Sequence, residues 1–252
     1  MNDDRIRRER AFHDERFADD SERQQTVGRF YQIVERMVSE YSSGVREASR
    51  GKRVLEYGCG TGSQAFSLAA NGADVTAIDI SSTAIALASQ QAQRLGIRTR
   101  VTFAEMNAEK LALADDSVDL ICGSGILHHL DLEISCAEIN RVLVSGGNAH
   151  FIEPLGHNLA INLFRRLTPG IRSEDEHPLT ATDLEYLASK FGKVHVDYYY
   201  LTAILAAFIP RKRLPRLFHS MLRALDGLDR WIFRFVPPLR KQAWFCRIVV
   251  TK

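Results

Sequence analysis

The chain has 252 residues, 45% of them hydrophobic, which is enough for one sizeable core. Its formal net charge is only +2, so nothing in the overall charge argues for a nucleic-acid partner. We expect neither a secretory signal, because "MNDDRIRRERAFHDERFADD" lacks an apolar h-region, nor a membrane span, because the apolar run Leu201 to Ile209 is too short. Four scattered cysteines without a CxxC pair predict reduced thiols, a cytoplasmic location and no metal site.

The first elements in chain order are a charged segment and a helix. Residues 1–20 are mostly charged, and we expect them either to be mobile or to fold over another part of the chain. A helix is then predicted from Ser21, which is suited to be its N-cap. Its apolar residues recur at helical spacing as far as Tyr41: Val27, Phe30, Tyr31, Val34, Met37, Val38 and Tyr41.

Strand and helix patterns alternate in the next hundred residues. The predicted strands are Arg53–Tyr57, Asp74–Asp79, Arg100–Ala104, Val118–Cys122, Ala149–Glu153, Lys193–Tyr199 and Ala243–Thr251. Helical patterns lie near Gly62–Asn71, Ser82–Leu95 and Glu133–Leu143, and a later helix is expected to start near Thr180. This order predicts a mostly parallel sheet with helices on both faces. We expect one domain, with an N-terminal helical cap (1–48), a cofactor-binding half (49–155) and an acceptor side (156–252) that carries a helical insert (201–239).

A glycine loop leaves the first predicted strand at the ligand-binding end of such a sheet. In "EYGCGTG", Gly58 and Gly60 permit a tight turn and close approach of a ligand, and Gly62 permits close helix packing. Asp79 ends the next strand, 21 positions after Gly58, where its carboxylate can accept hydrogen bonds from both hydroxyls of a ribose. The loop and the acid together predict an adenosine-containing ligand.

The spacing GxGxG differs from the GxGxxG of dinucleotide-binding proteins. Glu56, just before the loop, is unfavourable for a pyrophosphate, which prefers positive potential and unpaired N–H groups. The same carboxylate suits a ligand that carries an amino group and a sulfonium cation. An NAD-dependent oxidoreductase is therefore the weaker alternative.

The successive motifs "VLEYGCGTG", "VTAIDIS", "AEMNAEKLALADDSVDLI" and "GILHHL" resemble those of class I S-adenosylmethionine-dependent methyltransferases, particularly the small-molecule branch. The resemblance covers about residues 50–155. It implies a three-layer Rossmann-like α/β fold with a seven-stranded sheet of order 3-2-1-4-5-7-6 whose last strand is antiparallel. It also implies S-adenosyl-L-methionine as cofactor, held by Glu56, Gly58, Cys59, Gly60, Gly62, Asp79, Ile80, Asn107, Ala108 and Gly123. Asn107 departs from the aspartate that the family more often has there, although its amide oxygen can also accept a hydrogen bond.

Candidate bases for the acceptor follow the fourth and fifth strands. These candidates are His128, His129, Glu153 and His157. Helix packing or capping is an equally good interpretation of His128 or His129 alone, and at most one of this adjacent pair is expected to face the acceptor. Glu153 is slightly better explained as fixing the turn after Pro154. The hydrophilic cluster Arg172–His177 is predicted to be a solvated loop, with a lid as the alternative.

The insert has a basic amphipathic pattern. Residues 210–241 carry a net charge of +7, and apolar residues from Leu214 to Phe235 form one helical stripe, interrupted at Gly227. The simplest interpretation is a helix pair that packs on the sheet edge with its arginines in solvent. The alternative is a lid over the acceptor pocket that also contacts an anionic membrane surface, in which case Phe218 and Trp231 should line the pocket.

The resulting hypothesis is methyl transfer from S-adenosylmethionine to a small, apolar organic acceptor, with oxygen favoured as the accepting atom, as in biosynthesis of small molecules. The alternative from another class is a non-catalytic protein that binds S-adenosylmethionine or S-adenosylhomocysteine. A nucleic-acid acceptor is disfavoured, because "CGSGILHH" follows the fourth strand instead of a base-clamping motif of the Asn-Pro-Pro-Tyr type. The acceptor's identity and the oligomeric state do not follow from the sequence.

Overall fold

The computed structural model describes residues 2–18, 28, 30–97, 100–168, 173 and 175–252. Its centre is one seven-stranded sheet of order β3-β2-β1-β4-β5-β7-β6, as the family resemblance implied. β7 is antiparallel to both of its neighbours, and the other strand pairs are parallel. The strands are β1 (Arg53–Tyr57), β2 (Asp74–Asp79), β3 (Val101–Glu105), β4 (Val118–Ser124), β5 (Leu143–Pro154), β6 (Lys193–Tyr199) and β7 (Phe245–Thr251).

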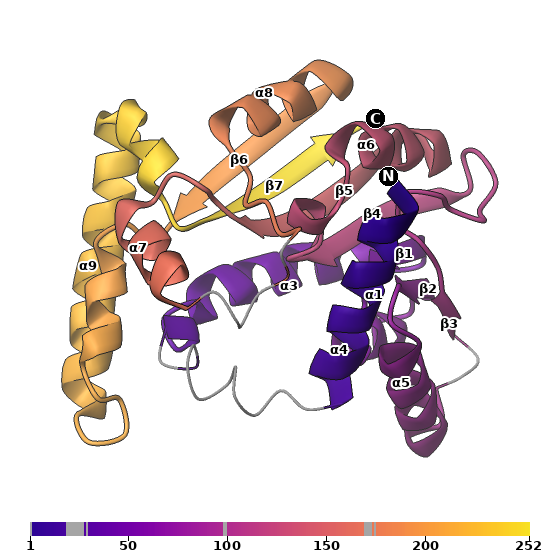
Figure 1. The fold of residues 1–252 in the computed structure, drawn as a ribbon, viewed down its shortest axis with the longest axis horizontal. Coiled ribbons are helices and arrows are strands. Elements are labelled where there is room, and N and C mark those ends of the chain that lie inside the picture. The colour runs from indigo at the N-terminus through magenta and orange to yellow at the C-terminus, as the bar shows by residue number, and fades with distance from the viewer. Residues whose placement is uncertain (1, 19–27, 29, 98–99, 169–172, 174) are drawn as a thin grey trace.

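Helices cover both faces of this sheet (Figure 1). On one face, side chains of α3 (Glu35–Ser49), α4 (Ser63–Ala70) and α5 (Ser82–Leu95) pack into one apolar core. On the other face, α6 (Leu132–Val142) and α8 (Ala181–Lys190) contribute to a second core. Neighbouring strand residues alternate between the cores, because successive side chains of a strand point to opposite faces. Val54 of β1 belongs to the first core and Leu55 to the second.

Local sequence explains where several helices begin. The hydroxyl of Ser81 accepts a hydrogen bond from Ala84 N at the start of α5, and Asp131 accepts from Glu133 N and Ile134 N at the start of α6. Thr180 and Asp183 form a reciprocal capping box at the start of α8. These caps fix the loops at the carboxyl ends of the strands.

The N-terminal region differs from its prediction. Residues 2–18 form a helix, α1 (Asn2–Ala18), and the described part of the predicted helix from Ser21 breaks at a turn over residues 32–34. α3 then continues to Ser49, eight residues beyond the predicted end at Tyr41. The proposed N-cap, Ser21, lies outside the described residues.

The insert before β7 also differs in part. It contains a short 3-10 turn, η3 (Ala203–Phe208), a single helix, α9 (Pro215–Phe235), and a second 3-10 turn, η4 (Pro237–Gln242). A further helix, α7 (Leu159–Leu167), lies outside the insert and follows β5. α9 passes through Gly227 without a break, because an isolated glycine costs a helix only about 1 kcal/mol. α9 lies at the far end of the molecule from β3 and α5 (Figure 1).

Two acidic residues anchor α9 to the rest of the fold. Asp229 is 1% exposed and accepts hydrogen bonds from the amides of Leu201, Thr202 and Ala203 and from the hydroxyl of Thr202. Asp226 forms an ion pair with Arg36 of α3 at 2.6 Å. These acids therefore determine which side of α9 faces the protein.

Candidate active site

The glycine loop after β1 has the backbone conformation that its sequence predicts. Gly58, Gly60 and Gly62 all have positive φ angles of 69°, 51° and 82°, a region that residues with a side chain rarely adopt. A Cβ atom on Gly60 would lie 3.1 Å from Phe17 of α1, and one on Gly62 would lie 2.9 Å from Phe103. The first two glycines border a cavity, and the third begins α4.

That cavity measures about 300 Å³ and lies at the carboxyl ends of β1, β2 and β4. Seven of the ten predicted cofactor residues line it: Gly58, Cys59, Gly60, Asp79, Ile80, Asn107 and Ala108. The other three, Glu56, Gly62 and Gly123, are not among the described lining residues. Gly123 has a packing role instead, since a Cβ there would lie 2.8 Å from Ile126 and 3.0 Å from Phe151.

Asp79 organises the loop as well as facing the cavity. One carboxylate oxygen accepts a hydrogen bond from Gly60 N at 2.8 Å, and the other accepts from Ser81 N at 2.9 Å. A carboxylate has about four acceptor positions, so capacity remains for two ribose hydroxyls. Asn107 is similar, because its Oδ1 accepts from Glu109 N at 2.9 Å and has one lone pair left for an adenine amino group.

Glu56 lies beneath the loop, 6% exposed, and its Oε2 has no hydrogen-bond partner among the described residues. Burial raises the pKa of this carboxyl to about 8, because the charged form is poorly solvated there. An unpartnered, buried carboxylate oxygen fits the ammonium group of an amino-acid ligand. This is the kind of atom that was expected at the methionine end of the predicted cofactor, although Glu56 itself is not among the described residues that line the cavity.

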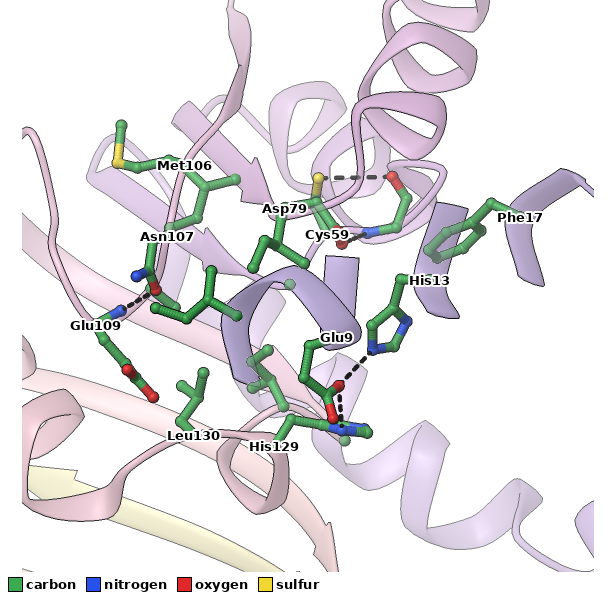
Figure 2. A pocket seen from close by; sticks show the side chains of 18 of the residues that line it. Glu9, His13, Phe17, Cys59, Asp79, Met106, Asn107, Glu109, His129 and Leu130 are labelled. Carbon is green, nitrogen blue, oxygen red and sulfur yellow. Dashed lines mark hydrogen bonds and ion pairs between the residues drawn. The ribbon is translucent and has the colours of Figure 1, made fainter. Parts of the chain in front are cut away.

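Helix α1 closes the cavity (Figure 2). The sequence left open whether residues 1–20 fold over another part of the chain, and it did not place them at the cofactor cavity. The helix contributes six lining residues: Arg5, Ile6, Glu9, His13, Arg16 and Phe17. Asp14 fixes the helix to the start of α5 by accepting from Ser81 Oγ at 2.5 Å and from Thr83 N at 3.1 Å. The available signal was the spacing of Ile6, Glu9, His13 and Phe17, which places them on one helical face.

A second cavity of about 470 Å³ borders the first. Arg16, Ser124, Gly125 and His129 line both cavities, so the two spaces meet at these residues. The rest of the second cavity is mainly apolar and aromatic, with Phe30, Tyr31, Met37, Ile161, Phe164, Trp244 and Phe245 among its lining residues. Glu176, from the predicted hydrophilic cluster, lines it too.

The candidate bases separate into two groups. His128, on the 3-10 turn η1 (Leu127–His129), lines the second cavity, and its Nδ1 lies 2.7 Å from Oε2 of the fully buried Glu153. His129 lines both cavities, and its Nδ1 lies 3.0 Å from Glu9 Oε2. His157 lines a different cavity, where its Nε2 accepts a hydrogen bond from Ala181 N.

Glu9 carries its charge in a largely buried position. Burial would raise the pKa of this carboxyl, but His129, His13 and the Ser173 hydroxyl outweigh that effect and hold it below its usual range. His13 Nε2 lies 3.4 Å from Glu9 Oε2, and Ser173 Oγ donates to Glu9 Oε1 at 2.6 Å. The wall between α1 and η1 is therefore rich in groups that can hold or move protons.

The insert, residues 201–239, does not line either of the two cavities. Among the described residues, none of 201–239 lines either cavity, so the expectation that this segment covers the acceptor pocket is wrong. Phe218 packs fully buried in the core beside η3, and Trp231 is 56% exposed. The amphipathic pattern of the insert correctly predicted that one face of the helix is packed. It could not predict which part of the protein that face contacts.

The sheet order, the glycine loop and the acid after β2 define a Rossmann-like domain for an adenosine ligand. Residues 55–151 match the family described as "Methyltransferase domain". This part of the chain therefore resembles a methyltransferase domain, as its class I S-adenosylmethionine-dependent motifs indicated. The match to a methyltransferase family also disfavours the NAD-dependent alternative.

Two curated relatives resemble part of the chain. A ubiquinone biosynthesis O-methyltransferase of Paraburkholderia phymatum is 35% identical over 115 residues, which cover 45% of this chain and 49% of the relative. A demethylmenaquinone methyltransferase of Chlorobaculum parvum is 35% identical over 111 residues, covering 43% of this chain and 44% of the relative. The chain thus spans about half the length of these relatives.

Solved structures share the fold over a longer stretch. A Haemonchus contortus phosphoethanolamine N-methyltransferase 2 in complex with S-adenosyl-L-methionine has a TM-score of 0.60 at 20% identity, over 81% of this chain and 49% of that one. The [4+2]-cyclase SpnF has a TM-score of 0.56 at 22% identity, over 84% of this chain and 79% of that one. These likenesses concern the fold alone.

No helix among the described residues is both long and apolar enough to cross a membrane.

Proposed function

We propose that the protein transfers a methyl group from S-adenosylmethionine to a hydroxyl oxygen of a small, largely apolar acceptor bound in the second cavity. The observation that carries this proposal is the junction of the two cavities at Ser124, Gly125 and His129. An aromatic-lined space of about 470 Å³ is within the usual range for small-molecule sites and suits a compound with a flat or prenylated body.

When bound, S-adenosylmethionine supplies the methyl group and retains the departing electron pair on sulfur. The protein's contribution is alignment and proton removal. His128 accepts the proton of the acceptor hydroxyl, since its Nδ1 is held by Glu153 and its Nε2 is the nitrogen left for the cavity. Glu153 positions His128 and favours the imidazolium that results, as a carboxylate does beside a catalytic histidine.

Glu153 is thus a positioning residue. Its Oε1 accepts hydrogen bonds from Ile126 N and Leu127 N, both at 2.9 Å, and so fixes the start of η1. The sequence favoured a role in fixing the turn after Pro154, whereas the described contacts of the carboxylate are with η1 and His128. His157 has no place in the proposed chemistry, because it lines a separate cavity.

A test combines S-adenosylmethionine bearing a labelled methyl group with a panel of prenylated catechols, apolar amines and apolar thiols. We expect label in an ether product, found by mass spectrometry, with His128→Ala reducing its formation. Label appearing only on nitrogen or sulfur would overturn the choice of oxygen. Cofactor binding without any transfer across the panel would support the non-catalytic alternative.

We also propose that an apolar and basic surface brings the protein to an anionic membrane that supplies such acceptors. On α7, Leu159, Leu163 and Leu167 are 78%, 60% and 73% exposed, and Trp231 and Phe235 of α9 are 56% and 60% exposed. α7 also lines the second cavity through Ile161, Phe164 and Arg165. Exposed arginines accompany the apolar side chains of α9 at positions 216, 223, 230 and 234.

A further inference from the structure

Three side chains of types that can bind a metal ion meet between α1 and η1 (Figure 2). Glu9 and His13 are four residues apart and therefore lie on the same face of α1, while His129 ends η1. One ligand atom from each lies within 4.8 Å of the other two. Elements separated by more than a hundred residues thus present two imidazoles and one carboxylate to a common point.

The separations fit ligands of one small cation. His129 Nδ1 and His13 Nε2 lie 3.0 Å and 3.4 Å from the same oxygen, Glu9 Oε2. Two atoms that are each about 2.1 Å from a tetrahedral Zn²⁺ ion lie about 3.4 Å apart. Small side-chain adjustments would therefore place the ion between atoms that already face one another.

The polar atoms at this point lack other partners. Glu9 Oε2 and His129 Nδ1 are buried and have no hydrogen-bond partner among the described residues, although they are at ion-pair distance. Glu9 and His129 are only 4% and 8% exposed, so solvent supplies little compensation. A cation that accepts electron pairs from both atoms would satisfy them together.

The surroundings hold these ligands in place. Ser173 Oγ donates to the other Glu9 oxygen at 2.6 Å, and Arg5 donates to the backbone oxygen of His129 at 2.6 Å. The first of these hydrogen bonds orients the carboxylate, as hydrogen bonds to metal-binding carboxylates do, and the second holds the backbone at His129. Arg5 and Arg16 also line the cavity and oppose a cation there, whereas Glu109, paired with Arg5, offsets part of that charge.

We propose that Glu9, His13 and His129 bind one divalent transition-metal ion of the Zn²⁺ class. Two nitrogen ligands and one oxygen ligand suit Zn²⁺, Co²⁺ and related ions better than Mg²⁺ or Ca²⁺, which prefer oxygen. Three protein ligands leave a coordination position open. Because His129 borders both cavities, that position can take an oxygen of the acceptor, a role that rests on the proposed methyl transfer.

The sequence-based expectation of no metal site considered only the cysteines, which are buried and scattered. The proposed ligands escaped notice because His129 is remote in sequence from the Glu9–His13 pair. A second group, His128, His129 and Glu176, also has ligand atoms within 4.8 Å of one another and shares His129. We assign the ion to the first group, because Glu9 Oε2 and His129 Nδ1 are buried atoms without a hydrogen-bond partner among the described residues.

The test is titration of the tag-free, chelator-treated protein with Co²⁺, followed by its visible absorption and by calorimetry. We expect one Co²⁺ per chain, with the intense bands of a four- or five-coordinate ion, displaced by Zn²⁺. Glu9→Gln and His13→Gln should each weaken binding at least tenfold, the size of loss typical when a metal site is damaged. His195→Gln should bind normally, because His195 is an exposed histidine that is likewise paired with an acid, Asp197.

Absence of a stoichiometric Co²⁺ site in the unmodified chain would overturn the proposal and leave Glu9 and His129 in contact without a metal ion. Unchanged binding in Glu9→Gln and His13→Gln, with loss in Glu176→Gln, would move the ion to the second group and equally overturn it. Far-ultraviolet circular dichroism and the unfolding temperature check that each variant is folded. No acceptor is needed, so failure of the methyl-transfer proposal does not affect the outcome.

Discussion

His128 Nδ1 lies 2.7 Å from Glu153 Oε2, while the other oxygen of that carboxylate holds the amides at the start of η1. This arrangement makes the tautomer of His128 dependent on Glu153. A carboxylate only accepts hydrogen bonds, so it keeps the proton on Nδ1 and leaves a lone pair on Nε2. The first prediction follows from this dependence.

Glu153→Gln should lower turnover by about 10²–10⁴ without altering cofactor affinity. The glutamine oxygen can still accept the η1 amides, but its NH₂ group would donate to Nδ1 and leave the proton on Nε2, where it cannot act as a base. Steady-state kinetics and S-adenosylhomocysteine titration separate the two effects. His195→Ala, on the exposed part of β6, serves as the control. Near-normal turnover of Glu153→Gln would show that the acceptor loses its proton without His128.

Glu56 predicts proton release when the cofactor binds. Burial raises the pKa of its carboxyl to about 8, so at pH 7 the ligand-free protein holds a proton there. The ammonium group of S-adenosylhomocysteine favours the carboxylate, and binding should release most of one proton at pH 7. The release should disappear well above pH 8, where Glu56 is already ionised.

Calorimetry in two buffers of different ionisation enthalpy measures this number. Glu56→Gln cannot release the proton and should bind more weakly, so its titration needs higher concentrations. Equal proton release by the original chain and the variant would assign it to another group, and no release from either would show that Glu56 is already charged.

Strand positions could be predicted because each buried strand is a short apolar run bounded by loop residues. β1, β2 and β6 have the predicted bounds, whereas β5 begins six residues before the predicted Ala149, since "VSGGN" has one apolar residue and two glycines, a pattern typical of a turn. The glycine loop and Asp79 could be placed because their spacing reflects one strand and one helix. These features depend on residues that are close together in the sequence, so they can be predicted from one sequence alone.

Features that depend on contacts between distant segments were not predictable in the same way. α1 lacks a wide apolar stripe, because it buries Glu9 and His13 against the cavity instead of a hydrophobic core. The location of α9 depends on Asp226 and Asp229, which look like ordinary surface acids in a basic segment. Only the fold shows that they are buried and hydrogen-bonded.

Asp79→Ala should reduce cofactor affinity by more than the tenfold expected from lost ribose contacts. The carboxylate also accepts from Gly60 N and Ser81 N, and each charge-assisted hydrogen bond contributes about 1.5–3 kcal/mol. The loop should therefore become less ordered as well. S-adenosylhomocysteine titration checks this, with Asp74→Ala as control, because Asp74 begins the same strand but its side chain is 71% exposed. Equal affinities for the two variants would contradict the assignment.

The last prediction concerns the apolar and basic surface. The protein should sediment with phosphatidylglycerol-containing vesicles but not with purely phosphatidylcholine vesicles, and less so as salt is added. Each arginine close to an anionic surface contributes about 1 kcal/mol within a Debye length, and exposed aromatic rings add insertion into the headgroup region. Trp231→Gln combined with Phe235→Gln should abolish most of the binding.

Leu95→Gln is the matched control, because Leu95 is 52% exposed at the end of α5, far from α9 (Figure 1). It should sediment like the original chain. Arg223→Gln combined with Arg230→Gln should weaken binding at low salt and reduce the salt dependence, which separates the electrostatic from the apolar contribution. If both pairs of substitutions leave vesicle binding unchanged, another surface makes the membrane contact. If the original chain does not sediment with anionic vesicles at low salt, the proposed membrane contact is excluded.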